Sequence, residues 1–287
     1  MSSISPSYER ATELTESLKG VNESIRAAAE SISSEKPILV AVSKRKPVSD
    51  IMACFQAGQI DFGENYANEL VEKAEQLPQD IRWHFIGTLQ SNKVKALAGI
   101  VIFHVFPNAY FYILSGVPNL YMVQTLSSAK TAAALDKQLP VSRQTPLNVM
   151  LQINTSGEES KSGLPPLHTE GSETEGEESN SLEIYELASY IISHCKRLHI
   201  LGVMTIGSFE ASTDDSAPNP DFECLLRTRD ALEEKLQAEA PGTRWGKDGR
   251  LLLSMGMSSD FEAAIRAGSN IVRVGTSIFG ERSNKLA

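Results

Sequence analysis

The chain has 287 residues, of which 41% are apolar and 22% charged, with a formal net charge of −9 and a pI near 5.2. A chain of this length can bury a sizeable core, either as one barrel-type domain or as two smaller domains. The acidic balance argues against a nucleic-acid-binding protein, because phosphate binding depends on a basic surface. Three cysteines (Cys54, Cys195 and Cys224) lack metal-type spacing and fit a reducing compartment, so we expect no metal site.

The first predicted element is a helix over residues 8–33, with apolar side chains every three or four positions. After it, short apolar runs alternate with segments of helical pattern. The predicted strands are Ile38–Val42, Ile60–Phe62, Trp83–Ile86, Leu120–Val123, Val149–Ile153, Ile200–Ile206, Leu251–Met255 and Ile271–Val274. The predicted helices cover residues 48–57, 66–77, 91–98, 128–138, 182–194, 221–238 and 259–267.

This alternation predicts an α/β fold, a single (β/α)₈ TIM-type barrel over residues 1–287 with an extra N-terminal helix. An open, doubly wound sheet is the alternative. No GxGxxG motif follows the first strand, which weakens a dinucleotide-binding version of that sheet. We therefore favour the barrel.

Two segments interrupt the alternation. Residues 165–181 are acidic and rich in glycine and serine, which predicts a flexible, tolerated loop. Residues 100–116 (IVIFHVFPNAYFYILSG) are uncharged and largely apolar. A membrane span needs about 20 apolar residues, and this segment has Pro107 and Asn108 near its middle, so we expect no membrane span. The N-terminal residues lack the apolar core of a secretory signal, which favours a cytoplasmic location.

A lysine follows the first predicted strand, within the segment AVSKRKP (41–47). Barrel strands present side chains to a catalytic mouth at this end, so Lys44 is a candidate functional residue. A lysine amine forms Schiff bases when burial or neighbouring charge lowers its pKa. Taken alone, the segment is more typical of an ordinary solvated lysine at a strand end.

Small residues and hydroxyls follow the last two predicted strands, around Ser254 and Met257 and then at Gly275 and Thr276. Loops at these two positions of such barrels frequently bind phosphate through backbone N–H groups. Glycine lets the backbone approach the anion, and serine or threonine adds a hydroxyl donor. Ordinary turn chemistry would produce the same composition, so both interpretations stay open.

An arginine, Arg273, lies inside the last apolar run, where a permanent charge requires an ion-pair partner or a ligand. His84 and Asn65 also fall at or near strand ends, although a lone histidine there is more often structural. A lysine, a phosphate cradle and an inward arginine around one barrel mouth suit pyridoxal 5′-phosphate (PLP), a phosphorylated aldehyde.

Longer motifs strengthen this interpretation, because the sequence resembles the YggS/PROSC family of PLP-binding homeostasis proteins over nearly its whole length. The matching segments are AVSKRKP (41–47), FGENYANEL (62–70), WHFIGTLQSNK (83–93), INTSGEESKSGL (153–164), GVMTIG (202–207), NPDF (219–222), LSMGMSSDFEAAI (253–265) and GSNIVRVGTSIFGER (268–282).

The resemblance implies a barrel like the N-terminal domain of alanine racemase, a monomer that binds PLP without established turnover. It makes Lys44 the Schiff-base lysine and places Arg273 against the pyridine nitrogen. It gives the phosphate to Ser254, Gly275 and Thr276, with the backbone around Met257 nearby. Asn65 and His84 belong to family motifs at the pocket.

The favoured function is therefore a carrier that buffers PLP and supplies it to apo-PLP enzymes, with a cytoplasmic location and a mitochondrial pool as a further option. The first alternative is a PLP-dependent amino-acid racemase. Alanine racemases add a C-terminal β-domain and a second base, a tyrosine, for which we expect no room after the last barrel motif. The second alternative is a barrel that lost its ligand and serves as an interaction module.

The segment 100–116 departs from the family, which passes from the helix after SNK to the next strand in a few residues. Our hypothesis is that it is translated intron or an error in the gene model, which in-frame transcripts would disprove. If the segment is genuine, it adds an apolar patch that invites aggregation or a partner.

Overall fold

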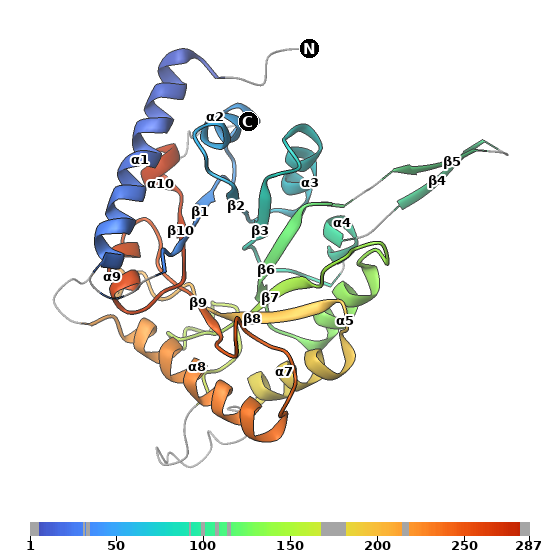
Figure 1. The fold of residues 1–287 in the computed structure, drawn as a ribbon, viewed down its shortest axis with the longest axis vertical. Helices are drawn as coiled ribbons and strands as arrows, with labels where there is room; N and C mark the ends of the chain where they lie inside the picture. The colour runs from blue at the N-terminus through green and yellow to red at the C-terminus, as the bar shows by residue number, and fades with distance from the viewer. Residues whose placement is uncertain are drawn as a thin grey trace.

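A computed structural model of the chain describes residues 6–30, 32, 35–91, 93–98, 101–106, 109–113, 116–167, 182–213 and 218–281. Eight parallel strands form a closed barrel in the order β1-β10-β9-β8-β7-β6-β3-β2. Figure 1 shows these strands as a ring with the helices arranged around it. The predicted (β/α)₈ barrel is confirmed.

All eight barrel strands coincide with predicted strands, with ends that shift by up to three residues. They are β1 (Ile38–Val42), β2 (Asp61–Glu64), β3 (Arg82–Phe85), β6 (Leu120–Leu126), β7 (Leu147–Gln152), β8 (Leu198–Met204), β9 (Leu252–Ser254) and β10 (Ile271–Val274). The helices are α1 (Tyr8–Glu30), α2 (Val48–Gln56), α3 (Ala67–Gln76), α4 (Val94–Ala98), α5 (Ala129–Gln138), α7 (Glu183–His194), α8 (Pro220–Glu239), α9 (Phe261–Arg266) and α10 (Thr276–Phe279). The short α10 is the one helix of this set that the sequence pattern did not predict.

The extra N-terminal helix α1 packs beside the seam where the barrel closes, against α2, α9 and α10. Its apolar stripe, from Leu14 to Ile25, is buried at helical spacing. Arg10 anchors its N-terminal end, with Nη2 donating to Asp50 Oδ2 of α2 at 2.7 Å and to the carbonyl of Phe279 in α10 at 2.9 Å. This helix therefore ties the first and last β-α units together.

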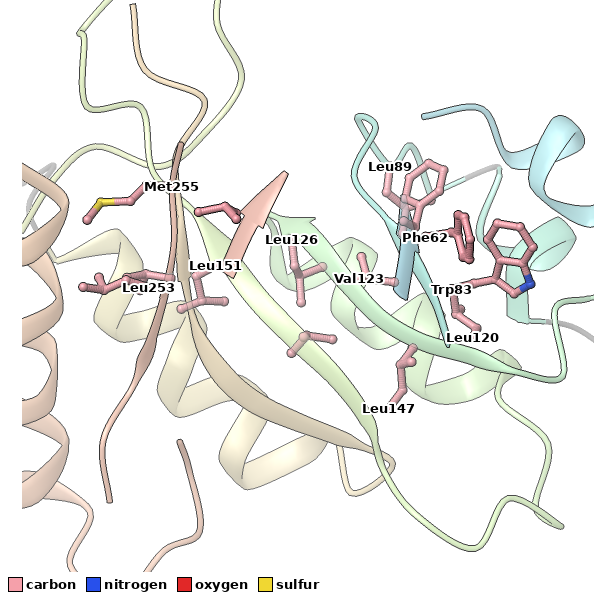
Figure 2. Close-up of a cluster of buried hydrophobic side chains, with 14 of the residues drawn as sticks. Phe62, Trp83, Leu89, Leu120, Val123, Leu126, Leu147, Leu151, Leu253 and Met255 are labelled. Carbon is pink, nitrogen blue, oxygen red and sulfur yellow. The ribbon is translucent and has the colours of Figure 1, made fainter. Parts of the chain in front are cut away.

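Side chains alternate between the two faces of the strands, as the period of two requires. The outward face forms the larger core under the helices, where Phe62, Trp83 and Val123 are fully buried (Figure 2). Inside the barrel, a smaller apolar cluster consists of Val40, Met122, Met150, Met204 and Ile271. Polar side chains take the remaining inward positions near the carboxyl ends of the strands, and these positions build the site.

Within the apolar segment at 100–116, the described residues form two antiparallel strands, β4 (Val101–Phe106) and β5 (Ala109–Ile113), as a sheet separate from the barrel. Figure 1 shows this two-stranded sheet extending away from the ring between α4 and β6. Most of the predicted acidic loop, residues 168–181, lies outside the described residues. Among the helices in the described part of the chain, none is long and apolar enough to cross a membrane.

Candidate functional site

The predicted site residues gather at the carboxyl ends of the strands. Lys44 follows β1, Asn65 follows β2, Met257 follows β9, and Gly275 and Thr276 follow β10. In a closed parallel barrel these ends share one mouth, where TIM-barrel active sites lie. Two larger cavities, of about 610 and 480 Å³, lie beside the amino ends of the strands, where barrels of this kind do not build their active sites.

Lys44 occupies a tight turn whose ends are fixed. The N–H of Lys46 donates to the carbonyl of Ser43 at 3.0 Å, which closes the turn over residues 43–46. Arg45 has φ of 59°, a left-handed conformation that a residue with a side chain rarely adopts. Lys46 Nζ donates to the carbonyls of Phe279, Gly280 and Glu281 at 2.9–3.0 Å, which joins the turn to the end of α10.

A buried ion cluster lies under this turn and consists of Glu64, Lys73 and Glu69. Lys73 Nζ donates to Glu64 Oε1 at 2.7 Å and to Glu69 Oε1 at 2.6 Å. Its third bond, at 2.8 Å, goes to the carbonyl of Ser43. Burial raises the pKa of Glu64 to about 7 despite the opposing effect of Lys73, so this carboxyl titrates near neutral pH.

Two oxygen atoms at the carboxyl end of β2 lack a hydrogen-bond partner among the residues that the structure describes. They are Glu64 Oε2 and Asn65 Oδ1, and both are buried. Gly87 lies directly against Asn65, because a Cβ added there would stand 2.0 Å from the Asn65 carbonyl oxygen. Buried oxygens in this state are uncommon in folded proteins and mark a place where a ligand or water completes the hydrogen bonding.

Arg273 lies inside the barrel with 4% of its surface exposed. Its Nη1 donates to Ser254 Oγ and its Nη2 to the carbonyl of Thr205, both at 2.7 Å. Burial lowers the pKa of Arg273 to about 10, partly offset by the nearby charge of Asp260, so the guanidinium remains charged at neutral pH. The sequence predicted an ion-pair partner or a ligand for this charge, and within the barrel the guanidinium donates instead to the neutral acceptors of Ser254 and Thr205.

A chain of hydrogen bonds continues from Arg273 across the barrel interior. Ser254 Oγ donates to Gln124 Oε1 at 2.7 Å, and Gln124 Nε2 lies 3.1 Å from His84 Nδ1. His84 Nε2 lies 2.8 Å from Asp61 Oδ1. With Gln124 as the donor to Nδ1, the Nε2–H of a neutral His84 donates to Asp61, and every bond in the chain has one donor and one acceptor.

The chain ends at Asp61, which also pairs with Arg82. Burial raises the pKa of Asp61, but the hydrogen bonds from His84 and Arg82 and the positive charge of Arg82 outweigh it and the net shift is downward. Both ring nitrogens of His84 are therefore engaged within the barrel, and the histidine lies between Asp61 and Gln124. The sequence pointed to His84 but not to Gln124 or Asp61.

The turn after β9 faces the turn after β10. Gly256 has φ of +92°, and a Cβ there would stand 2.5 Å from Ala264, so only glycine fits. The N–H of Gly275 donates to Ser258 Oγ at 3.1 Å, and the N–H of Met257 donates to Asp260 Oδ1 at 2.6 Å. The structure thus places Ser258, two residues beyond Gly256, beside Gly275, while the Ser254 hydroxyl is bound to Arg273 and Gln124.

A polar cleft of about 210 Å³ lies on the β7 and β8 side of the mouth, lined by residues that include Gln152, Asn154, Thr155, Lys161 and Thr205. The hydroxyls of Thr155 and Thr205 are 2.8 Å apart. Lys161 Nζ donates to the carbonyl of Gly207 at 2.6 Å and to Glu158 at 2.5 Å. In the described part of the chain, no group of His, Cys, Asp and Glu side chains could hold a metal ion.

Comparison with known proteins gives consistent results. The profile of the family described as "Alanine racemase, N-terminal domain" matches residues 17–283. The pyridoxal phosphate homeostasis protein of Homo sapiens is 39% identical over 276 residues, which covers 92% of this chain and 85% of the relative. The protein of the same name from Schizosaccharomyces pombe is 40% identical over 245 residues, with 85% and 84% covered.

Two solved structures share the fold. A protein of unknown function from Bifidobacterium adolescentis superposes with a TM-score of 0.70 at 29% identity, over 96% of this chain and 97% of that one. PipY of Synechococcus elongatus, solved with PLP bound, superposes with a TM-score of 0.63 at 24% identity, over 93% of this chain and 100% of that one.

Proposed function

Because the chain belongs to the alanine racemase N-terminal domain family, and within it to the pyridoxal phosphate homeostasis proteins, we propose that it binds PLP at the barrel mouth. There it buffers this reactive aldehyde and delivers it to apo-PLP enzymes. The observation that carries the proposal is the placement of Lys44, Arg273 and the Ser258–Gly275 pair around one barrel mouth.

The residues at the mouth fit the functional groups of PLP. PLP offers an aldehyde, a phosphate, a phenolic oxygen and a ring nitrogen, and it supplies an aldehyde that condenses reversibly with amines. Lys44 provides the amine, and the Ser258 hydroxyl, which accepts from the Gly275 N–H at 3.1 Å, has a proton to donate to the phosphate. The buried oxygens of Asn65 and Glu64 provide acceptors that are not yet hydrogen-bonded within the described residues.

The phosphate position belongs to Ser258, Gly275 and Thr276, with the backbone at Met257 beside them. Ser258 replaces Ser254 in this role, because the Ser254 hydroxyl is held inside the barrel by Arg273 and Gln124. A side chain at residue 275 would crowd the end of β1, since its Cβ would stand 3.3 Å from the Val42 carbonyl oxygen. Glycine therefore lets the turn after β10 pack closely against β1.

Arg273 would face the ring nitrogen of bound PLP, and the hydrogen bonds through Ser254, Gln124 and His84 hold its guanidinium in place. A guanidinium only donates hydrogen bonds and keeps its charge, so it leaves the ring nitrogen without a proton. A carboxylate in this position would instead stabilise a protonated ring, which is a stronger electron sink. The arginine therefore makes the bound cofactor a weaker electron sink, which is compatible with storage and delivery. In this assignment His84 helps to hold Arg273 through Gln124 and Ser254 and does not touch the cofactor.

The test is the visible absorption spectrum of the purified protein with added PLP, before and after borohydride reduction. The proposal predicts an absorption band above 400 nm that reduction abolishes, and a pyridoxyl group on the peptide that contains Lys44. Lys44→Ala should lose both signals, whereas Lys137→Ala, at an exposed lysine on α5, should keep them. A wild-type protein that retains no such band after excess PLP has been removed by gel filtration would contradict the proposal.

Delivery needs a separate experiment. An apo-PLP enzyme should regain activity from the loaded protein at a rate that a PLP phosphatase in the mixture does not reduce. Release into solution before capture would make the reactivation sensitive to the phosphatase and would restrict the function to buffering. Incubation of the loaded protein with amino acids in D₂O should show negligible exchange of the α-proton, and rapid exchange would identify a racemase.

A further inference from the structure

The two chain neighbours of Lys44 are both held by the same buried ion cluster. On one side, Lys73 Nζ donates to the carbonyl of Ser43 at 2.8 Å. On the other side, the N–H of Arg45 donates to Glu69 Oε1 at 2.6 Å, and that oxygen also accepts from Lys73. The backbone on either side of Lys44 is therefore bound to two residues of α3 that pair with each other.

The cluster is built as a fixed support. Lys73 is 5% exposed, and its three ammonium donors are accounted for by Ser43, Glu64 and Glu69. Glu64 is fully buried, and its Oε1 accepts a second bond, from Ser43 Oγ at 2.7 Å. A buried ammonium group whose three N–H donors are all hydrogen-bonded is held in one position. Lys73 therefore fixes the turn relative to α3.

The turn needs such a support, because Arg45 has a left-handed backbone conformation that is unfavourable for a residue with a side chain. The Arg45 N–H is the donor that Glu69 binds, so this bond acts at the strained residue itself. Loss of the bond would let Arg45 relax toward ordinary backbone angles. That relaxation would rotate the adjacent Lys44.

We propose that Lys73 and Glu69 are positioning residues for Lys44, which hold its turn so that the amine meets an aldehyde anchored elsewhere in the mouth. This inference rests on the proposed function and adds residues of α3 that do not touch the cofactor. Reaction between two anchored groups depends steeply on their relative placement, and displacements of about 1 Å can cost a hundredfold in rate. A cluster that only stabilises the fold would leave that rate unchanged.

The experiment compares two reactions of the same amine. The first is attachment of PLP to Lys44, followed by borohydride trapping at increasing times and mass spectrometry of the peptide. The second is reductive methylation of Lys44 by formaldehyde, which is not anchored and so does not depend on the orientation of the turn. The variants are Lys73→Met and Glu69→Ala, and Glu69→Gln is the conservative variant because it keeps an acceptor oxygen for Arg45.

The matched controls are Glu72→Ala, at an exposed position of α3, and Lys95→Met, at an exposed position of α4. Near-UV circular dichroism shows which variants keep the native packing, and Glu69→Ala, at a partly exposed residue, serves if Lys73→Met does not fold. We expect Lys73→Met and Glu69→Ala to slow attachment of PLP by about tenfold or more, while formaldehyde labelling changes by less than about twofold. Glu69→Gln and both controls should resemble the wild type.

Native-like variants with wild-type rates of PLP attachment would overturn the positioning role and leave the proposed function intact. Equal slowing of both reactions would also overturn it, because the change would then lie in the reactivity of the amine and not in its placement. A wild-type protein that forms no adduct with PLP at all would instead refute the proposed function, and the positioning role with it.

Discussion

Two polar networks hold residues of the barrel mouth, and the two are built differently. One runs from Arg273 through Ser254, Gln124 and His84 to Asp61, and its three central members are uncharged side chains of the barrel interior. The other is compact and ionic, with Lys73 between two carboxylates at the contact between α3 and the ends of β1 and β2. The first network fixes a side chain, and the second fixes a turn of the backbone.

The difference shows how a closed barrel supports two kinds of contact at one site. Arg273 lies in the core, where neighbouring strands can offer inward side chains at every second residue, so neutral donors and acceptors suffice to orient it. Lys44 lies beyond the end of its strand, just past the bond in which the Ser43 N–H donates to the Gly63 carbonyl of β2 at 3.0 Å. The turn there is held by charge-assisted hydrogen bonds to a helix, which are stronger than neutral ones.

Removal of Gln124, the middle residue of the hydrogen-bonded network from Arg273 to Asp61, should cause the largest loss of stability. Gln124→Leu leaves the Ser254 O–H without its acceptor and His84 Nδ1 without its donor, and two such buried groups should lower the free energy of unfolding by about 2–4 kcal/mol. Denaturant titration of the variant measures this loss, and Gln144→Leu, at an exposed position, is the control. A loss below about 1 kcal/mol for Gln124→Leu would mean that the hydrogen-bonded network from Arg273 to Asp61 does not contribute to stability.

The ionic cluster should make stability depend on pH near neutrality. Burial raises the pKa of Glu64 from 4.5 to about 7, so between these values the folded protein holds a proton that the unfolded chain has lost. Stability of the wild type therefore falls as pH rises through this window. Glu64→Gln cannot lose a proton, so it should gain up to about 3 kcal/mol relative to the wild type between pH 4.5 and 8. Glu72→Gln should show no such gain, and a pH-independent difference for Glu64→Gln would contradict the assignment.

Asp61, the carboxylate at the end of the network that starts at Arg273, should make stability depend on pH in the opposite direction. His84 and Arg82 together lower the pKa of Asp61 below its ordinary value of 3.8, so its contribution is present above that pH and is lost as pH falls further. Asp61→Asn should cost about 1–2 kcal/mol at pH 7, and less as the solution is acidified below about pH 4. Thermal unfolding over a pH series measures this. A cost that grows on acidification would reverse the sign we assign.

The smallest expected effect is the coupling between the two networks. They share no hydrogen-bonded residue among the bonds described, so the effects of Gln124→Leu and Glu64→Gln should add within about 0.5 kcal/mol in a double-mutant cycle at pH 7. Additive effects on the free energy of unfolding would show that the two networks stabilise the protein independently. A coupling energy above about 1 kcal/mol would show that the site is one network.

The sequence predicted the barrel, because hydrophobic runs of strand length recur at β-α spacing and each run became a strand. It also predicted Lys44 and Arg273, since a lysine after a strand and an arginine inside one are conspicuous. Gln124, Asp61 and Lys73 were not predicted, because their contacts depend on which strands and helices become neighbours. Gln124 is 40 residues from His84 and 130 from Ser254 along the chain.

Ser258 could have been found from the sequence, because it belongs to the same SMGMSS segment that pointed to Ser254. The two serines are distinguished only by the turn at Gly256, which directs the chain from the barrel interior to the mouth. The β4–β5 sheet is a different case. Its segment lacks the charges that mark most turns and surface strands, so the sequence indicated an apolar insertion without its secondary structure.

The most direct test of the account is a crystal structure of the protein with PLP. We predict continuous density from Lys44 Nζ to the aldehyde carbon, the Arg273 guanidinium within hydrogen-bond distance of the ring nitrogen, and the phosphate against Ser258 and Gly275. PLP attached to a different lysine, or bound with its ring nitrogen away from Arg273, would contradict the assignment of this barrel mouth as the PLP site.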